Sequence, residues 1–591
     1  MNRGQILIVP AVEKGKGGGH LYRCATLVSD LRASDREAWL YLSAQTEETD
    51  RLLKTTNFNS SWRITDEELA NGDMQIEFVI LDRFQTPRKE LLRWKKTAPV
   101  IGIDEGGNNR ANFDFLIDIL IPEKLIFPKA NISSPFLLKF PPLPPSKKIS
   151  TDGILKVLIT FGQEDAAGLG QKTARTLSAM DGMEITLLMG ALAKGKIEQL
   201  PNVRIIESIP NLAEHLGEYD LVITHYGITA YEALFAGTPV LLDSPTAYHK
   251  KLAKTAGFYS FNSQIFHAKT QRRKDAEEYI KLKKHCEALA TRYKLREGEK
   301  LASLLDGFAP KVNRVCPVCG TNAPERSIAR FADRTYRRCS NCGVIFMDRI
   351  SPAPIEYERE YFFESYKKQY GKTYLEDFDS IKTVGKRRAK LINSFLPDGA
   401  ERSLLDIGCA YGPFLSAAKE EGFSPSGIDP AQDAVSYVQK ELKFPAVHGF
   451  FPDCPLPSES QFDAVTLWFV IEHFTDCSSV LVAIKKILKK GGILAFSTPS
   501  FSGVSGRSNL QRFLSASPAD HFTVWSPEMC RKALLRSGFK VKKIVSVGHH
   551  PERFALLGRF AKSKKSPLYF LLLAISKLFG LGDTFEVYAQ V

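Results

Sequence analysis

The residues best suited to bind a ligand form an Asp-x-Gly-x-x-x-Gly motif after an apolar run, at Asp406, Gly408 and Gly412. The two glycines let the backbone turn sharply and come close to a ligand at the start of the next helix. Asp429 ends the next apolar run, 23 positions after Asp406, and a carboxylate there can accept hydrogen bonds from both ribose hydroxyls. A dinucleotide site would instead show GxGxxG after this first strand. The pattern therefore predicts a nucleoside pocket at the carboxyl ends of parallel strands.

Two further elements follow in order: a strand at 462–468 that leads into 469–474, and a turn and strand at 488–499. The ordered set resembles the class I S-adenosylmethionine-dependent methyltransferases, over about residues 380–591. The resemblance implies a Rossmann-like domain with adenosylmethionine as cofactor. It also implies three roles: the methionine side of the pocket for Asp406, Gly408 and Gly412, the ribose for Asp429, and the adenine for Gly449 and Phe450.

Methyl transfer needs little from the protein beyond alignment of the nucleophile with an already activated methyl group. An acceptor hydroxyl or carbon acid also profits from a base, and Glu472, His473 and His521 are the candidates. The stretch 519–526 resembles the segment of sugar and small-molecule methyltransferases in which His and aromatic residues face the acceptor. The alternative, in which each histidine is a packed, neutral, hydrogen-bonded residue, stays open.

Two Cys-x-x-Cys knuckles, Cys316 with Cys319 and Cys339 with Cys342, have 19 residues between them. This spacing can place four thiolates around one Zn²⁺, and four cysteine ligands predict a structural metal. A redox pair is the alternative. A ribbon just before a methyltransferase resembles the arrangement of deoxysugar C-methyltransferases, in which the zinc module helps cover the substrate. The sequence shows no counterpart of that family's additional C-terminal domain, so the atom methylated is not predicted.

In the N-terminal half, a glycine-rich stretch at 14–19 precedes His20 and Arg23 and opens a helix. A second strand, glycine turn and helix at 221–239 contains Gly227, Thr229 and Glu232. Backbone N–H groups at such helix N-termini can hold an anion such as a diphosphate. Glycine-rich loops also serve as simple tight turns, and this alternative stays open.

These motifs resemble nucleotide-sugar enzymes of the two-Rossmann (GT-B) fold, and most closely the UDP-sugar hydrolase family of pseudaminic acid synthesis. By that resemblance His20 is the base that activates water or an acceptor hydroxyl. The implied substrate-binding residues are Gly19, Arg23, Gly227, Thr229 and Glu232. Hydrolysis and glycosyl transfer use the same fold and a similarly placed base, so the sequence does not decide between them.

The elements that must position these residues form an α/β chain of several domains. The expected domains are a Rossmann-like domain at 1–145, a nucleotide-sugar-binding Rossmann-like domain at 146–309, a zinc ribbon at 314–350, a helical connector at 351–395 and a methyltransferase domain at 396–591. The net charge of +14 is spread along the chain, which argues against nucleic acid as a partner. Ten cysteines, four of them in knuckles, and no signal peptide favour the cytoplasm.

We therefore expect a bifunctional enzyme of surface-polysaccharide or unusual-sugar biosynthesis, with a nucleotide-sugar and a sugar or glycoconjugate acceptor as partners. The alternatives are a methyltransferase whose N-terminal half only binds, and a nucleic-acid or protein methyltransferase that uses the ribbon to bind its target. A basic and apolar stretch at 562–579 is too short to span a bilayer. It could lie weakly on a membrane surface, but we expect it to be a helix buried against the methyltransferase sheet or the ribbon.

Overall fold

The structure, a computed structural model, has two compact units. The first unit is Met1–Lys311 with Arg330–Thr335 and Arg349–Ser351, and the second is Val312–Ala329, Tyr336–Asp348 and Pro352–Val591. None of the described helices is long and apolar enough to cross a membrane. The described residues are 3–591 without 13–17, 44–45, 55, 57, 73, 123, 135–153, 164, 166, 191–197, 208, 210, 262–271, 294–299, 352–365, 368–370, 398–401, 458–460 and 562.

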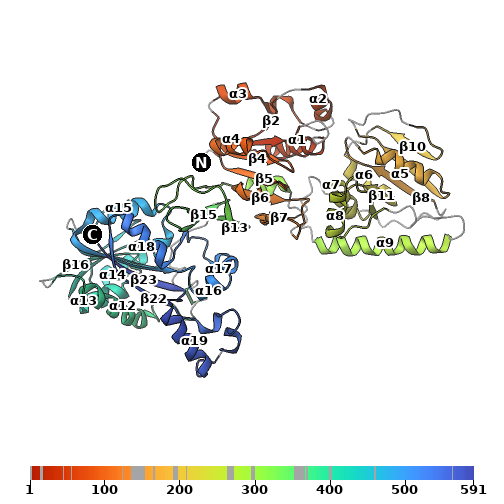
Figure 1. Cartoon of the computed structure of the whole chain (residues 1–591). Helices are drawn as coiled ribbons and strands as arrows, with labels where there is room; N and C mark the ends of the chain where they lie inside the picture. The colour runs from red at the N-terminus through yellow and green to blue at the C-terminus, as the bar shows by residue number, and fades with distance from the viewer. Residues whose placement is uncertain are drawn as a thin grey trace. The chain divides into compact units, whose positions relative to one another are not determined.

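The first unit begins with a seven-stranded sheet in the order β3-β2-β1-β4-β5-β6-β7, in which all neighbours are parallel. Its central strands are apolar and buried on both faces, as parallel strands covered by helices are. The strands are β1 (Gln5–Pro10), β2 (Ala38–Tyr41), β3 (Arg63–Ile64), β4 (Ile76–Asp82), β5 (Val100–Ile103), β6 (Phe115–Asp118) and β7 (Ile132–Ser133), and the helices are α1 (Gly18–Ala33), α2 (Glu47–Leu53), α3 (Asp66–Asn71) and α4 (Arg88–Thr97) (Figure 1).

A second parallel sheet of the first unit has the order β10-β9-β8-β11-β12. Its strands are β8 (Leu155–Thr160), β9 (Met183–Leu188), β10 (Val203–Ile206), β11 (Leu221–Thr224) and β12 (Val240–Leu242), and its helices are α5 (Leu169–Ser178), α6 (Leu212–His215), α7 (Ile228–Phe235), α8 (Ala247–Ala256) and α9 (Arg272–Tyr293). The last helix, α10 (Leu301–Asp306), returns to pack against α1 of the first sheet. An ion pair of 2.8 Å between Arg3 and Asp306 fixes this return.

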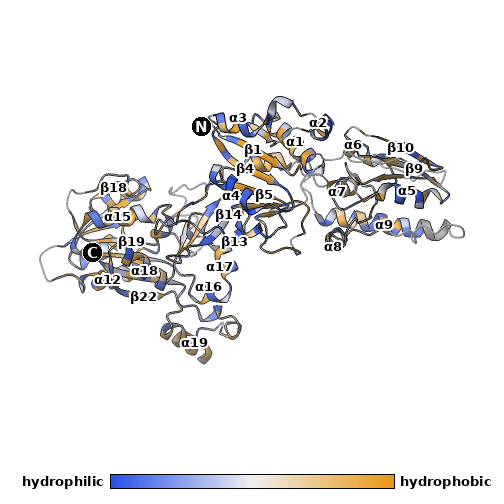
Figure 2. Ribbon diagram, turned by 45° about the horizontal axis from the view of Figure 1, so that its top comes forward, coloured by the Kyte–Doolittle hydropathy of each residue, from blue (hydrophilic) through white to orange (hydrophobic). Residues whose placement is uncertain are grey.

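The second unit is built on a sheet in the order β18-β17-β16-β19-β20-β23-β22, in which only β23 is antiparallel to its neighbours. Alternate residues of each strand face opposite layers: α12 and α13 cover Leu404 on one face, while α15 and α18 cover Leu405 on the other. The inner strand β19 is coloured mainly as hydrophobic in Figure 2. The strands are β16 (Arg402–Ile407), β17 (Phe423–Asp429), β18 (Ala446–His448), β19 (Phe462–Trp468), β20 (Leu488–Pro499), β22 (Lys540–Val547) and β23 (Thr584–Gln590). The helices are α12 (Phe378–Asn393), α13 (Pro413–Glu420), α14 (Gln432–Lys440), α15 (Cys477–Ile487), α16 (Val504–Ser508), α17 (Leu510–Ala516), α18 (Pro527–Arg536) and α19 (Pro567–Leu578).

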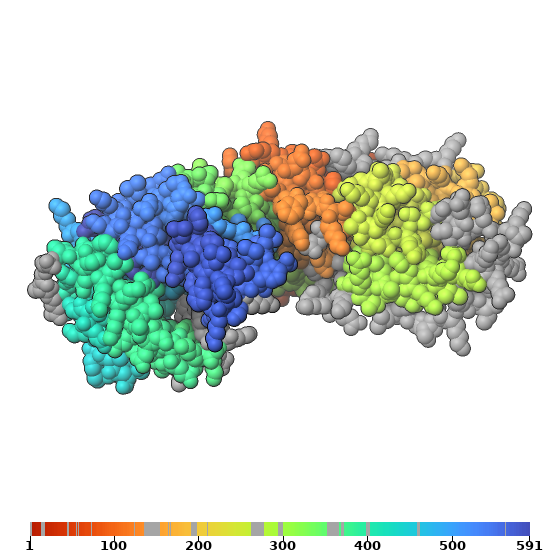
Figure 3. Space-filling view, turned by 60° about the horizontal axis from the view of Figure 1, so that its bottom comes forward, coloured from red at the N-terminus to blue at the C-terminus, as the bar shows by residue number. Residues whose placement is uncertain are grey.

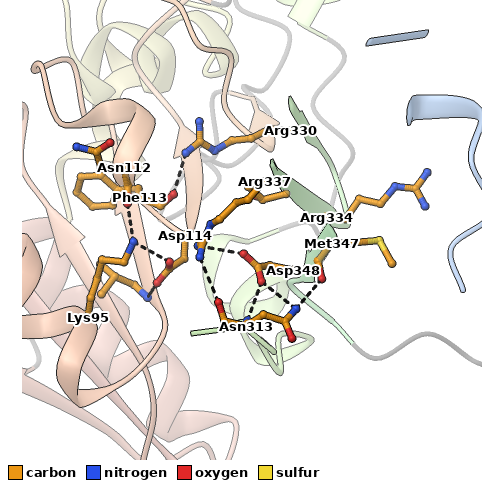
Figure 4. Close-up of polar contacts among 12 residues, drawn as sticks. Lys95, Asn112, Phe113, Asp114, Asn313, Arg330, Arg334, Arg337, Met347 and Asp348 are labelled. Carbon is orange, nitrogen blue, oxygen red and sulfur yellow. Dashed lines mark hydrogen bonds and ion pairs between the residues drawn. The ribbon is translucent and has the colours of Figure 1, made fainter. Parts of the chain in front are cut away.

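The cysteine knuckles lead into a small sheet, β13 (Ser327–Phe331), β14 (Arg334–Arg338), β15 (Ile345–Arg349) and β21 (Thr523–Val524). The fourth strand comes from the methyltransferase region, since Ile345 and Val524 are paired antiparallel. Figure 4 shows how the ribbon strands are held within the second unit. Arg337 forms a buried 3.0 Å ion pair with Asp348, and the backbone N–H of Asn313 donates to the same carboxylate over 2.7 Å.

Residues 330–335 belong to the first unit and are bonded within it. The guanidinium of Arg330 donates to the carbonyl of Phe113 over 2.8 Å, close to the 3.0 Å ion pair between Lys95 and Asp114. The amide of Asn131 donates to the carbonyl of Arg334 over 2.9 Å. These bonds satisfy polar groups that are buried within this unit.

Candidate functional site

The turn between β16 and α13 forms the floor of the predicted nucleoside pocket. Gly408 has φ of +76° and Gly412 has φ of +77°, a region in which residues with a Cβ are strained. A Cβ on Gly408 would also lie 2.4 Å from a methyl carbon of Val470. Asp406, in the strand before the turn, is buried and accepts a 2.6 Å hydrogen bond from the hydroxyl of Thr466. Its burial raises its pKa to about 7.

Asp429 is the last residue of β17 and lies beside this turn. Its carboxylate accepts a 2.7 Å hydrogen bond from the N–H of Ala410 and a 2.9 Å hydrogen bond from the N–H of Ala431. Burial raises its pKa to about 6, although both backbone hydrogen bonds favour the charged form. Each oxygen keeps a second lone pair, so the carboxylate is fixed in position and can still accept from a ligand hydroxyl.

Aromatic residues surround the same edge of the sheet. Gly449 and Phe450 follow β18, and the Phe450 ring is largely exposed. The rings of Tyr374 and Tyr411 contact each other at 6.2 Å between centroids, beside buried Ala410. The sequence interpretation did not single out these tyrosines. The only signal for Tyr374 was the Tyr-rich connector before the methyltransferase motifs.

The candidate base residues lie together beyond the end of β19. Glu472, His473 and His521 have ligand atoms within 4.8 Å of one another, and the two imidazole rings make an edge contact at 4.8 Å. His473 Nδ1 lies 3.1 Å from a carboxylate oxygen of Asp520, a residue that was not predicted. The same three groups could ligate a divalent cation through nitrogen and oxygen.

Charge at this cluster is tuned by burial and by pairing. Burial lowers the pKa of His473, but Asp520 and Glu472 outweigh it and the pKa is raised. Burial would raise the pKa of Asp520, and its bond to His473 brings the value to about 2. Glu472 is fully buried, and burial raises its pKa to about 7, although the charge of His473 and the hydroxyl of Thr498 oppose this. A buried carboxyl with a strongly raised pKa is typical of a functional site.

The ribbon sheet positions one side of this cluster. The backbone N–H of Met347, on β15, donates to the carbonyl of Phe522 over 2.9 Å, directly after His521. The pairing of β15 with β21 continues from there. The segment that holds Asp520 and His521 therefore leads directly into β21, the edge strand of the ribbon sheet.

The four predicted metal ligands lie together in the second unit, within 4.8 Å of one another. The sulfur of Cys316 is 3.7 Å from that of Cys342, and the sulfur of Cys319 is 3.6 Å from that of Cys339. Four sulfurs at the Zn–S bond length are about 3.8 Å apart in a tetrahedron, so the cysteines fit this metal. The ribbon and the methyltransferase sheet share one apolar core.

In the first unit, His20 and Arg23 belong to one buried ionic network on α1. His20 Nδ1 lies 2.8 Å from Asp82, at the end of β4. Arg23 is buried, binds Asp82, and lies 2.9 Å from Asp104 after β5. Burial would raise the pKa of Asp82, but Arg23 and His20 hold it below its usual range. Arg23 thus holds the carboxylate that contacts His20, and its expected place near a substrate stays a prediction.

The other predicted residues of this unit lie on and before α7. Gly227 caps the helix, and Thr229 and Glu232 follow in its first two turns. Burial raises the pKa of Glu232 to about 7. Burial also raises the pKa of Tyr22 on α1, and the charge of Glu232 adds to this rise. Gly19 has open space around its Cα. The glycine-rich stretch before it, residues 13–17, lies outside the described residues.

His225 was not predicted but lies against the same turn. Its ring stacks on Phe161 at 6.2 Å, and burial lowers its pKa to about 4. A Cβ on Gly162 or Gly227 would lie 3.2 or 3.6 Å from this ring. Its signal in the sequence was its place directly after β11, at the carboxyl end of a parallel strand, where ligands of α/β sheets bind.

The sheet of the second unit, with its glycine turn and with Asp406 and Asp429 toward the carboxyl ends of neighbouring strands, is that of a class I S-adenosylmethionine-dependent methyltransferase domain. Such a domain binds adenosylmethionine and a methyl acceptor.

Comparison with known proteins agrees with this class. A family model described as "Methyltransferase domain" matches residues 381–544. Over 188 residues the chain is 22% identical to a ubiquinone biosynthesis O-methyltransferase of Thiobacillus denitrificans, covering 30% of this chain and 80% of that protein. Over 110 residues it is 33% identical to the protein of that name from Paracidovorax citrulli, covering 16% of this chain and 43% of that protein. A solved methyltransferase of Archaeoglobus fulgidus aligns with a TM-score of 0.27 and 18% identity, over 39% of this chain and all of that one.

Proposed function

We propose that the second unit methylates a hydroxyl oxygen of a sugar or glycoconjugate, with His473 as the general base. The observation that carries this proposal is the 3.1 Å contact between His473 Nδ1 and Asp520, beside the buried Glu472. Relatives whose names describe O-methylation support oxygen as the acceptor atom. The acceptor class rests on the sequence resemblance of the 519–526 segment to sugar methyltransferases.

The residues of the cluster divide the work. Bound adenosylmethionine supplies an activated methyl group. Asp520 accepts a hydrogen bond from Nδ1–H of His473, which leaves Nε2 as the proton acceptor. His473 takes the proton of the acceptor hydroxyl. At the same time the hydroxyl oxygen forms a bond to the methyl carbon, and the bond between that carbon and sulfur breaks. Glu472 and Asp520 then stabilise the imidazolium through their charge.

A panel of methyl acceptors tests this assignment. Methyl transfer from labelled adenosylmethionine is measured with hydroxylated sugars, nucleotide-sugars, phenols and amines. We expect transfer to a hydroxyl compound, and His473→Ala should lower kcat about 10²- to 10⁴-fold while adenosylmethionine binds unchanged. His215→Ala, an exposed histidine of the first unit, is the matched control. Transfer to amines alone, or an unaffected His473→Ala enzyme, would contradict the proposal.

For the first unit we propose a GT-B-like fold that binds a nucleotide-sugar, with His20 as the base for hydrolysis or glycosyl transfer. Three observations support it: two parallel sheets in one unit, the return of α10 to α1, and His20 held by Asp82. Gly227, Thr229 and Glu232 then bind the nucleotide, and the whole protein is a bifunctional cytoplasmic enzyme of surface-polysaccharide or unusual-sugar biosynthesis. The alternative is a single-activity methyltransferase whose first unit only binds.

Binding and turnover of UDP-sugars separate these possibilities. His20→Ala should abolish turnover and leave UDP affinity nearly unchanged, because a base contributes to rate and little to ground-state binding. Glu232→Gln should weaken UDP binding. UDP binding without turnover in the wild-type protein would favour the alternative, and the lack of any nucleotide binding would contradict both.

We further propose that Cys316, Cys319, Cys339 and Cys342 hold one structural Zn²⁺. The sulfur separations of 3.6 and 3.7 Å support this, because they match a tetrahedral thiolate site. All four ligand positions are filled by cysteine, so the metal has no open position for a substrate. Its role is to stabilise the ribbon sheet that holds Asp520 and His521.

A further inference from the structure

The segment between β22 and β23 forms an apolar surface that the methyltransferase fold does not use. It contains two short helical turns, η7 (Pro551–Arg553) and η8 (Gly558–Phe560), and the helix α19. The sequence led us to expect α19 to be buried, and this is wrong: its outer face is exposed (Figure 3). The exposed side chains are Leu556, Leu557, Phe560, Phe570, Leu571, Leu578 and Phe579, each at least half exposed.

The helix is turned with its apolar side outward. Phe570, Leu571 and Leu578 lie on one face at helical spacing. The opposite face contains Leu572 and Ser576, which are buried, and the Ser576 hydroxyl forms a 2.8 Å hydrogen bond with His549. A polar contact thus anchors the inner face, whereas the outer face carries the large apolar side chains.

The segment is held rigidly, so the exposed face is a built feature of the fold. Arg553 forms a 3.0 Å ion pair with Asp583, and the hydroxyl of Ser508 donates to the carbonyl of Arg553 over 3.1 Å. Ser546 donates to the carbonyl of Gly580, at the end of α19. These contacts fix both ends of the segment to the methyltransferase sheet.

Charge identifies the kind of partner. The segment between β22 and β23, residues 548–583, includes six Lys or Arg against two acidic residues, Glu552 and Asp583, and Asp583 is paired with Arg553. Arg559, Lys564, Lys565 and Lys577 are exposed around the apolar face. A second copy of this surface would meet it with the same positive charge, which disfavours self-association. An apolar face bordered by cations is the pattern of a helix that lies in the headgroup region of an anionic bilayer.

We propose that α19 and the η7–η8 turns dock the protein on an anionic lipid surface, with the apolar face inserted and the lysines at the headgroups. The surface lies in the methyltransferase unit but outside the candidate site, so the inference stands even if the proposed acceptor is wrong. It implies that the enzyme works at a membrane surface without spanning it.

Vesicle flotation with the full chain tests the proposal, using phosphatidylglycerol in phosphatidylcholine against phosphatidylcholine alone. We expect binding only to the anionic vesicles and its loss at high salt. The apolar variant Phe570→Ser/Leu571→Ser/Leu578→Ser should lower the partition coefficient of the protein onto anionic vesicles at least tenfold. The charge variant Lys564→Glu/Lys565→Glu/Lys577→Glu should lower it about fivefold per charge. The matched controls change exposed positions elsewhere in this unit. The control for the apolar variant is Val482→Ser/Leu535→Ser, and the control for the charge variant is Lys440→Glu/Lys490→Glu/Lys540→Glu.

Two readouts keep the test independent of misfolding. An unchanged adenosylmethionine affinity shows that a variant is folded. In the Phe570→Trp variant, lipids with brominated acyl chains should quench the fluorescence of the new tryptophan, which shows that this side chain is inserted. Vesicle binding that is equal in the α19 variants and the controls would overturn the proposal. A failure to bind anionic vesicles would also overturn the proposal. If sedimentation then showed a dimer that the apolar variant disrupts, the face would be a protein interface.

Discussion

At the residue scale, Asp429 shows how one carboxylate can organise a turn and remain available to a ligand. Its two oxygens accept from Ala410 and Ala431, and a charged acceptor contributes about 1.5–3 kcal/mol per hydrogen bond. We expect Asp429→Asn to weaken adenosylmethionine binding by about tenfold or more, measured by calorimetry. Asp463→Asn is a matched change at the amino end of β19, away from the candidate site, and it should leave the adenosylmethionine affinity unchanged. Equal affinities in both variants would mean that the ribose lies elsewhere.

Glu472 predicts a pH dependence of stability. Its pKa is raised from 4.5 to about 7 by burial, so the neutral form favours folding below the unfolded pKa. This contribution is lost as the pH rises through about 7, at a cost of about 3 kcal/mol. Glu472→Gln removes the charge, and denaturant unfolding should show it to be more stable than the wild type at pH 8 and similar at pH 5. The exposed Glu528→Gln change should have no such effect, and a pH-independent gain in Glu472→Gln would contradict the explanation.

At the element scale, the sequence predicted those parts of the site that are local in the chain. The turn with Gly408 and Gly412, the terminal carboxylate of β17 and the four cysteines each follow from spacing within one or two elements. The pairing of β15 with β21 joins strands almost 180 positions apart, and no local pattern encodes it. Asp520 was missed for this reason, because its contact to His473 depends on that pairing.

Tertiary packing also decides what a local pattern leaves open. The burial of Arg23 depends on two carboxylates that are distant in the chain, Asp82 of β4 and Asp104 after β5. The apolar composition of α19 indicated a core helix, yet which face of a helix is buried depends on its neighbours. In α19 the buried residues are Leu572 and Ser576, whereas several larger apolar residues remain exposed.

The ribbon predicts an effect on catalysis without contact to the cofactor. Cys339→Ser should lower bound zinc below one ion per chain, because three thiolates bind less tightly than four. Since β15 holds the segment of Asp520 and His521, we expect kcat to fall severalfold or more, with little change in adenosylmethionine affinity. Zinc is measured by atomic absorption. Cys454→Ser, outside the cluster, is the control, and full activity in zinc-free protein would contradict the positioning role.

At the scale of the whole molecule, two compact units with separate cores predict two unfolding transitions. All four cysteines and the nucleoside pocket belong to the second unit, whereas His20 and Glu232 belong to the first. A ligand stabilises only the unit that binds it, by about 2.7 kcal/mol at a hundred times its Kd.

Calorimetry of the full chain should therefore show adenosylmethionine raising one transition by roughly 5 °C and leaving the other in place. Zinc chelation should lower the same transition that adenosylmethionine raises, because the ribbon and the methyltransferase sheet share one core. UDP should raise the other transition if the first unit binds it. Asp429→Asn is the control, since it should remove the response to adenosylmethionine alone. A single transition that responds to every ligand would contradict this prediction, because it would show that the two units unfold cooperatively. Hydrogen exchange would then locate the protection that each ligand gives and so assign each site to a unit.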